Sequence, residues 1–260
     1  MPWACRRGFA GGWWETLSKS CRKMFDGGSA YPDDIDICNC GFDPGEGAAP
    51  PRAELVERPG LEAGSLSWRM QLSGASLYWH VATTSGKQLC GDPEFLHGKD
   101  VLEVACMRGG GARYLASAMG TRSYIATDID EDCIESCRSS CGSAPLGGLD
   151  FRVAGAVELR DVFGPEAFDA VLCVQSVAVF ADPGAFVANS AAVLRPGGRL
   201  LLCDMFSMDD LRATLQMLQE SGLVCDAVHD LSEGVTRVGV CVPSEDRGYA
   251  LIVARKPAPE

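Results

Sequence analysis

The sequence predicts an α/β fold: a doubly wound, mostly parallel sheet of seven strands with helices on both faces, preceded by an N-terminal helical cap. After residue 98, apolar runs of about four to seven residues alternate with helical stretches of about ten to thirteen, which is the pattern of βαβ units. The composition agrees, because 47% hydrophobic and 22% charged residues are typical of a globular domain. A length of 260 residues accommodates one such domain with an N-terminal addition.

Cap and turn residues divide the region after residue 98 into its elements. Asp130 and Asp182 are expected helix N-caps, Pro183 suits a first helical position, and Gly222 ends a helix. The expected strands are 100–106, 123–128, 150–153, 168–174, 199–203, 224–229 and 249–254. The expected helices are 112–119, 131–140, 183–194 and 208–221, with a tight turn at 195–198 and a candidate strand at 237–242.

The chain divides into three segments. Residues 1–60 are interpreted as an N-terminal extension, with a short amphipathic helix at 14–25 and a linker rich in Pro, Gly and acids at 31–60. Residues 61–98 are interpreted as a helical cap, because apolar and aromatic side chains recur through this stretch. Residues 99–257 form the predicted sheet domain.

The charge and the cysteines limit partners and location. A net charge of −12 disfavours DNA and RNA, and without a run of 18 apolar residues no membrane span is expected. Thirteen cysteines and no apolar signal-peptide core predict a cytoplasmic protein with reduced thiols, among them Cys106 and Cys173 in the core. Cys133, Cys137 and Cys141 have helical spacing and are expected to pack as small core residues. With only three histidines, no metal site is predicted.

One group of residues, at the ends of the first two predicted strands, indicates a ligand-binding site. The first predicted strand contains Glu103, a turn with Gly109–Gly111 follows it, and a helix begins at once. Glycine lets backbone approach a ligand closely, and a helix start offers free N–H groups. The second strand ends in Asp128, whose carboxylate is placed to accept both hydroxyls of a ribose. This pattern predicts a nucleotide pocket at the carboxyl edge of the sheet.

Five stretches then carry a family resemblance. They are VLEVACMRGGGARYLA at 101–116, YIATDID at 124–130, FDAVLCVQSV at 168–177, VLRPGGRLLLCD at 193–204 and YALIVARKP at 249–257. In this order they resemble the motifs of class I S-adenosylmethionine (SAM) dependent methyltransferases, and most closely those acting on small molecules and lipids. The resemblance covers about 155 residues and implies a Rossmann-like fold.

The resemblance implies SAM as the cofactor. Asp128 would hold the ribose, Ile129 would pack on the adenine, and Glu103 would lie near the methionine amino group or support the turn. The other implied cofactor positions are the turn residues Ala105, Met107 and Gly109, the adenine-edge residues Ala156 and Val157, and Gln175 facing the sulfonium or the acceptor.

The turn departs from the family pattern, which has glycine at all three positions. Ala105 and Met107 replace the first two, and Met107 is expected to need a left-handed backbone that costs about 1–2 kcal/mol. Gly155 and Ala156 also stand where an Asp-Ala pair often contacts the adenine, which removes one cofactor hydrogen bond. A degenerate methyltransferase fold that serves as a binding or regulatory module is therefore an alternative function.

The expected activity is methyl transfer to a small or lipid-like acceptor, with oxygen or carbon methylation favoured by analogy. Tyr78 and Trp79, in the cap, are candidate acceptor-binding residues, since aromatic rings suit a sulfonium or an apolar acceptor. His80 and His229 are candidate general bases. An NAD(P)-dependent oxidoreductase is disfavoured, because a GxGxxG pattern read from residue 105 gives Ala, Met and Gly.

Overall fold

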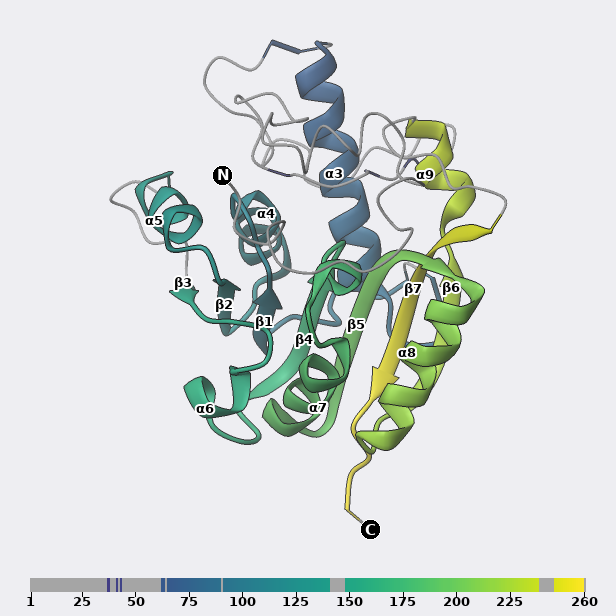
Figure 1. Cartoon of the computed structure of the whole chain (residues 1–260). Helices are drawn as coiled ribbons and strands as arrows, with labels where there is room; N and C mark the ends of the chain where they lie inside the picture. Colours follow the sequence, from purple (N-terminus) through teal and green to yellow (C-terminus); the bar gives the residue numbers. More distant parts are fainter. Residues whose placement is uncertain are drawn as a thin grey trace.

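The computed structural model describes residues 37, 41, 43, 62–63, 65–89, 91–140, 148–238 and 246–259. Its centre is a seven-stranded sheet in the order β3-β2-β1-β4-β5-β7-β6 (Figure 1). The strands are β1 Asp100–Val104, β2 Ser123–Asp128, β3 Leu149–Val153, β4 Phe168–Val174, β5 Leu194–Ser207, β6 Val224–Asp230 and β7 Arg247–Arg255. Strands β1 to β5 pair in parallel, and β7 is antiparallel to both β5 and β6, so the predicted mostly parallel sheet is confirmed.

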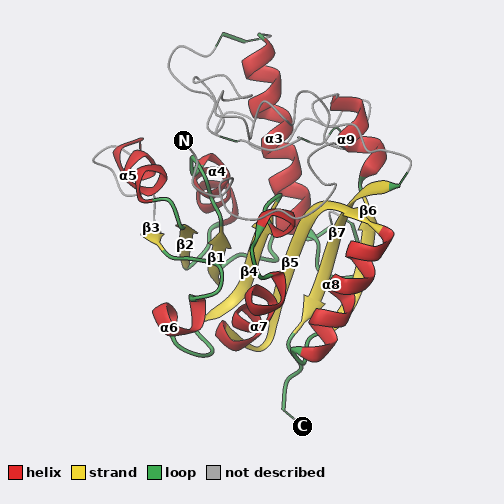
Figure 2. Cartoon of the chain, viewed as in Figure 1, coloured by secondary structure: helices red, strands yellow, loops and turns green. Residues whose placement is uncertain are grey.

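Helices cover both faces of this sheet (Figure 2). They are α3 Leu66–Thr83, α4 Gly110–Met119, α5 Glu131–Ser140, α6 Leu159–Phe163, α7 Pro183–Val193, α8 Met208–Glu220 and α9 Ser232–Val238, with a 3₁₀ turn η3 at Val177–Val179. Buried residues of α3, α4 and α5 share one hydrophobic cluster, and those of α6, α7 and α8 share another. The doubly wound architecture is therefore confirmed.

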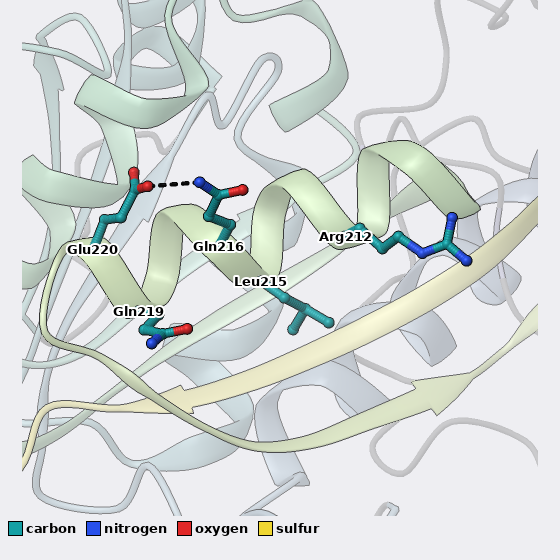
Figure 3. A pocket seen from close by; sticks show the side chains of 5 residues that line it. All are labelled: Arg212, Leu215, Gln216, Gln219 and Glu220. Carbon is teal, nitrogen blue, oxygen red and sulfur yellow. Dashed lines mark hydrogen bonds between the residues drawn. The ribbon is translucent and has the colours of Figure 1, made fainter.

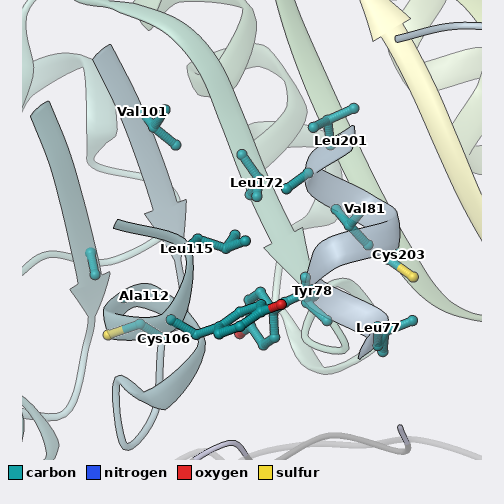
Figure 4. Packing of buried hydrophobic residues seen from close by; sticks show 14 of the residues in the cluster. Leu77, Tyr78, Val81, Val101, Cys106, Ala112, Leu115, Leu172, Leu201 and Cys203 are labelled. Atoms are coloured by element: carbon teal, nitrogen blue, oxygen red, sulfur yellow. The ribbon is translucent and has the colours of Figure 1, made fainter. Parts of the chain in front are cut away.

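The alternation of strand side chains separates the two clusters. In β1, Val101 faces the cluster that contains α3 and α4, whereas Leu102 and Val104 face the cluster that contains α7 and α8. Figure 4 shows the first cluster, in which Tyr78 of α3 and Leu115 of α4 pack together over the strands. Glu103 lies two residues after Val101 and therefore on the same face of the strand, so its side chain points toward α3 and α4. Its hydrogen-bond partners come from this side of the sheet.

The predicted caps and breaks follow from local chemistry. Asp130 Oδ1 accepts the Asp132 and Cys133 N–H groups at 2.9 and 3.2 Å at the start of α5. Ser207 and Asp210 form a reciprocal capping box at α8. Gly222 follows α8 with a φ of 74°, which suits glycine after a helix end. The predicted signals at Asp130 and Gly222 are confirmed because they depend on residues within one helical turn, whereas the box at Ser207 was not expected.

Removal of the Asp182 cap tests one of these local interactions. Asp182 Oδ1 accepts the Ala185 N–H at 2.8 Å, and Pro183 occupies the first helical turn of α7. We expect Asp182→Ala to lower the free energy of unfolding by about 1 kcal/mol, since one helix N–H loses its partner. Asp182→Asn keeps an acceptor oxygen and should stay close to wild type in the same urea titration. Equal losses in both variants would contradict the capping role.

Three sequence expectations differ from the structure. The candidate strand at 237–242 is wrong for residues 237 and 238, the two that the structure describes, because they end helix α9. The predicted tight turn at 195–198 belongs to strand β5, although Gly197 has a φ of 81° and the pairing with β4 is irregular there. The short helices α6 and α9 were not expected, because five and seven residues give little periodicity. The expected helix at 14–25 and Cys141 lie outside the described residues.

The segment before the sheet packs more closely than its composition indicates. Among the described residues of 61–98, α3 is one continuous helix, and residues 93–98 form turns. Ile37, within the predicted linker, is only 2% exposed, and its N–H donates to Gln71 Oε1 at 3.1 Å. In the described part of the chain, no helix has the length and apolarity needed to cross a bilayer.

The two edges of the sheet have different roles. At the amino edge, Arg195 bridges Asp100 and Asp169 at 2.9 and 3.0 Å, and so joins the starts of β1 and β4. Strand β7 ends at the same edge, where the Lys256 N–H donates to the Gly198 carbonyl at 2.9 Å. The carboxyl edge of β1 and β2 instead ends in loops near α3 and α4 (Figure 1). A site at this edge is therefore separate from the ion pairs that fasten the sheet.

Candidate functional site

The strand order reverses at β1. Strand β2 lies on one side of β1 and β4 on the other, so the connections that follow these strands leave in opposite directions. In open α/β sheets, ligands bind at the carboxyl end of such a switch point. The turn between β1 and α4, residues 105–109, lies at this point and forms the centre of the candidate site.

The turn has an unusual backbone. Ala105, Met107 and Gly109 have φ values of 62°, 51° and 69°, all in the left-handed region. The Gly109 N–H donates to the Cys106 carbonyl at 2.8 Å, and the Cys106 N–H donates to the Thr127 carbonyl at 2.9 Å. The left-handed backbone expected at Met107 is present, and Ala105 has it as well. Non-glycine residues in this region are strained, and such strain collects at functional sites.

Met107 is held by its backbone while its side chain stays accessible. Its N–H donates to Asp128 Oδ2 at 2.9 Å, and its carbonyl accepts from the Cys137 thiol at 3.2 Å. The side chain is 43% exposed, so it does not fold back into the core. The turn is thus fixed from β2 and α5, and its outer side remains open to a ligand.

Asp128 is oriented by two backbone groups. Besides the Met107 N–H, it accepts the Asp130 N–H on Oδ1 at 3.0 Å. Each carboxylate oxygen has two acceptor positions, and the Ile129 backbone also acts on this carboxylate, so acceptor capacity remains for a further donor. Partial burial raises the pKa of Asp128 above its ordinary value, while the backbone N–H groups act in the opposite direction. The arrangement suits a hydroxyl donor.

Exposed apolar side chains extend from this carboxylate. Ile129 is 72% exposed and Val157 is 45% exposed, although both are large hydrophobic residues. Ala156 is half-buried against the core cluster, and a Cβ at Gly155 would lie 3.6 Å from Ile129 Cδ1. An apolar surface beside an oriented carboxylate matches the needs of a nucleoside, whose base is flat and whose sugar is polar.

Glu103 is buried beneath the turn. It is 1% exposed, and its two oxygens accept hydroxyl hydrogens from Tyr78 and Tyr124, each at 2.7 Å. Burial raises the pKa of Glu103 to about 7, against the opposing effect of the two tyrosine hydrogen bonds. Of the two roles that the resemblance implies for Glu103, this geometry favours support of the turn.

The buried carboxyl gives a testable pH dependence. Glu103 titrates at about 7 in the folded chain and at an ordinary 4.5 when exposed, so folding takes up a proton between these pH values. We therefore expect the free energy of unfolding to fall by about 3 kcal/mol as the pH rises from 4.5 to 7. Burial also raises the pKa of Asp204 to about 6, which adds a fall of the same sign over a lower pH range.

Glu103→Gln isolates this contribution. The amide keeps the size of the side chain and does not titrate, so the stability of the variant should depend less on pH over the same range. Urea titrations of both chains at pH 5 and 7.5 make the comparison. Parallel pH profiles for the two chains would show that Glu103 is already ionised at pH 5.

The glycines after the turn serve packing inside the protein. A Cβ at Gly109 would lie 2.6 Å from the Phe151 ring and 2.7 Å from Cys137 Sγ. A Cβ at Gly111 would lie 2.1 Å from the Tyr78 ring. These glycines therefore let α5 and α3 approach the start of α4, a requirement that the sequence pattern alone did not indicate.

The two histidines lie on separate elements. His80 of α3 is buried, its Nδ1 is 3.0 Å from the Ser76 carbonyl, and burial lowers its pKa below the ordinary 6.5. His229 of β6 places Nε2 2.7 Å from the Gly86 carbonyl. Trp79 is half-buried on α3, and Gln175 follows β4 with a φ of 57° and donates its N–H to the Cys203 carbonyl at 2.7 Å.

Three contributors were missed by the sequence reasoning. Tyr124 and Cys137 support Glu103 and Met107, and Asp204 accepts the Ala178 N–H at 3.1 Å, which orders the segment after β4. Asp204 ends a stretch that resembles a family motif, and its place after four apolar residues was an available signal. Tyr124 and Cys137 have no such signal, because their partners lie 21 and 30 residues away.

A surface hollow elsewhere is separate from this site. It has a volume of about 720 Å³ and lies along α8 (Figure 3). Its lining residues are Arg212, Leu215, Gln216, Gln219 and Glu220. All of them come from one helix that covers the sheet face opposite α3 and α4, so the hollow contributes nothing to the turn at 105–109.

Known proteins that resemble this chain in sequence are methyltransferases. Residues 102–202 match the family described as a methyltransferase domain. The chain is 34% identical over 148 residues to a fatty-acid O-methyltransferase of Mycolicibacterium smegmatis, covering 54% of this chain and 52% of that one. It is 40% identical over 110 residues to phthiotriol/phenolphthiotriol dimycocerosates methyltransferase 1 of Mycobacterium ulcerans, covering 42% and 39%. The chain thus spans about half the length, or less, of these relatives.

Solved structures share the fold. The (4+2)-cyclase SpnF superposes with a TM-score of 0.64 at 18% identity, covering 87% of this chain and 89% of that one. Geranyl diphosphate C-methyltransferase of Streptomyces coelicolor A3(2), solved with S-adenosyl-L-homocysteine, has a TM-score of 0.59 at 13% identity, covering 85% and 93%. The fold alone does not define the reaction, since one of these proteins is a cyclase. This chain shares its fold with these structures, and its residues 102–202 match a methyltransferase domain.

Proposed function

We propose that this chain is a SAM-dependent methyltransferase that acts on a small or lipid-like acceptor, with oxygen or carbon methylation favoured. The observation that carries the proposal is the pairing of Asp128 with Met107, which orients a carboxylate at the switch point of the sheet. The methyltransferase family match includes both residues. The alternative function is a binding or regulatory module, and the observation that favours it is the strained turn with few glycines.

The residues of the site fit an adenosine-bearing cofactor. The open side of the turn, the remaining acceptor capacity of Asp128 and the exposed Ile129 and Val157 supply a sugar-binding and a base-binding surface. The proposed cofactor residues are those expected from the sequence: Glu103, Ala105, Met107, Gly109, Asp128, Ile129, Ala156, Val157 and Gln175. Within this set, Glu103 acts through the turn because its oxygens are held by tyrosines.

The chain's own residues would mainly orient and desolvate the reactants. When bound, SAM would supply an electrophilic methyl carbon that the acceptor attacks in line, with S-adenosylhomocysteine as the leaving group, so alignment would provide much of the rate. Tyr78 and Trp79 are proposed to border the acceptor from the cap. The lowered pKa of His80 keeps its imidazole neutral near pH 7, which is the state that a general base requires. His229 is a second proposed base.

The names of the relatives support the proposed acceptor class. Their names refer to a fatty acid and to dimycocerosate lipids, and each is a methyltransferase. The net charge of −12 disfavours a strongly anionic acceptor such as a diphosphate. A long-chain carboxylic acid or hydroxylated lipid is therefore the proposed acceptor. Because Cys106, Cys133, Cys137, Cys173, Cys203 and Cys225 are free thiols, we also propose a reducing, cytoplasmic location.

Calorimetry with SAM and a methyl-transfer assay test the proposal. We expect SAM to bind, and radiolabelled methyl to move from SAM to a long-chain fatty acid in preference to geranyl diphosphate. Binding of SAM without transfer to a panel of fatty acids and hydroxylated lipids would favour the regulatory module. Absence of binding at millimolar SAM would remove the methyltransferase proposal.

A further inference from the structure

The ends of the turn at 105–109 meet a single residue of the cap. Glu103 lies two residues before Ala105, and its carboxylate accepts the Tyr78 hydroxyl at 2.7 Å. Gly111 lies two residues after Gly109, and the Tyr78 ring occupies the space where a Cβ at Gly111 would stand. Tyr78 therefore touches both sides of the turn at once, although it comes from helix α3.

The turn needs such support. Ala105 and Met107 hold left-handed backbone without the freedom of glycine, and such conformations persist only where the surroundings over-determine them. Asp128 and Cys137 hold Met107 at the middle of the turn. Cys137 also lies beside Gly109, whereas Tyr78 reaches the strand before the turn and the helix after it.

The side chain of Tyr78 is buried and held at both its ring and its hydroxyl. It is 6% exposed, and Figure 4 shows it projecting from α3 into the cluster that contains Cys106 and Ala112. Its hydroxyl and ring are both engaged, so its rotation is restricted. The other tyrosine on Glu103, Tyr124, is a residue of strand β2 and donates to the second oxygen of the same carboxylate.

We propose that Tyr78 is a positioning residue that couples the cap to the cofactor turn: by clamping Glu103 and Gly111, it holds Ala105 and Met107 in the backbone that binds SAM. The inference rests on the proposed function for its ligand, and on the hydrogen bond to Glu103 and the ring contact at Gly111 for its mechanism. It assigns the cap helix a direct part in cofactor affinity, in addition to any contact with the acceptor.

Two phenylalanine variants separate this role from general stability. Tyr78→Phe and Tyr124→Phe each remove one hydroxyl from the same carboxylate and keep the ring. We expect Tyr78→Phe to raise the Kd for SAM about tenfold and Tyr124→Phe to raise it less than about threefold, both measured by calorimetry on chains shown to be folded by circular dichroism. Equal effects of the two variants would overturn the proposal.

Glycine in the turn provides a second test. In an Ala105→Gly, Met107→Gly background the strain is relieved, so adding Tyr78→Phe should raise the Kd less than about threefold. A purely structural role of the hydroxyl would leave the tenfold effect unchanged in that background. Such additivity would therefore contradict the coupling of Tyr78 to the strained residues.

Hydrogen exchange of the apo chain distinguishes failure of this inference from failure of the proposed function. The Cys106 amide donates to the Thr127 carbonyl of β2 and the Gly109 amide donates to the Cys106 carbonyl, and we expect both to exchange about tenfold faster in Tyr78→Phe than in Tyr124→Phe. Equal exchange rates would overturn the positioning role even if the wild-type chain binds SAM. If the wild-type chain binds no SAM but the exchange rates differ, the proposed function fails and the clamp on the turn remains.

Discussion

Asp128→Ala is expected to raise the Kd for SAM at least tenfold, which corresponds to about 1.4 kcal/mol of binding free energy. The substitution removes the carboxylate that is placed for the sugar hydroxyls and also the acceptor of the Met107 N–H at 2.9 Å. The turn then loses its central restraint while it still carries the strain at Ala105 and Met107. Isothermal calorimetry with SAM measures the effect directly.

Asp130→Ala is the matched control. Asp130 lies two residues further along and caps α5 through its side chain, while only its backbone N–H contacts Asp128. We expect this variant to lose about 1 kcal/mol of stability and to keep its SAM affinity within about threefold. If Asp128→Ala binds SAM as the wild type does, Asp128 is not part of the cofactor site.

Gly111→Ala should cause the largest loss of stability among the substitutions considered. The added Cβ would lie 2.1 to 2.5 Å from three carbons of the Tyr78 ring, and that ring is buried and fixed by Glu103. Neither partner has room to move, so we expect a loss of about 3 kcal/mol in the free energy of unfolding. Thermal melts should show a fall in Tm of about 10 °C for a domain of this size.

Gly184→Ala provides the comparison, since Gly184 also lies in the first turn of a helix. The nearest atom to its added Cβ is Asp182 Oδ1 at 3.4 Å, which is an ordinary contact. Alanine is the better helix former, so this variant should stay within about 1 kcal/mol of wild type. A Gly111→Ala chain as stable as Gly184→Ala would show that Tyr78 does not occupy the described position.

Local signals predicted the elements that hold the site. The caps at Asp130 and Asp182 act over two or three residues, so they were visible in the sequence and are present in the structure. The alternation of apolar runs and helical stretches likewise gave the α/β class, because burial on both faces of a parallel sheet requires continuous apolar strands. The positive φ of Met107 was expected because the family pattern that the sequence resembles has glycine at this position.

Contacts between distant segments could not be predicted. Tyr78 was expected at the acceptor, yet its hydroxyl binds a carboxylate 25 residues later, and nothing in either local pattern specifies that pairing. Of the expected strand at 237–242, the structure describes residues 237 and 238, and they form the end of helix α9. A short segment takes the structure that its packing favours, which its own sequence does not reveal. Roles of His80 and His229 also depend on an acceptor whose shape the sequence does not encode.

The return of β7 along the sheet has a practical consequence for measurement. Its nine residues carry the chain about 30 Å, from the level of the site to the amino edge, where Lys256 is anchored to Gly198. A biotin or fluorophore attached just beyond Lys256 is therefore displayed on the side of the domain away from residues 105–109 (Figure 1). Sensor-chip immobilisation through that end would leave the methionine-bearing turn facing the flow of analyte.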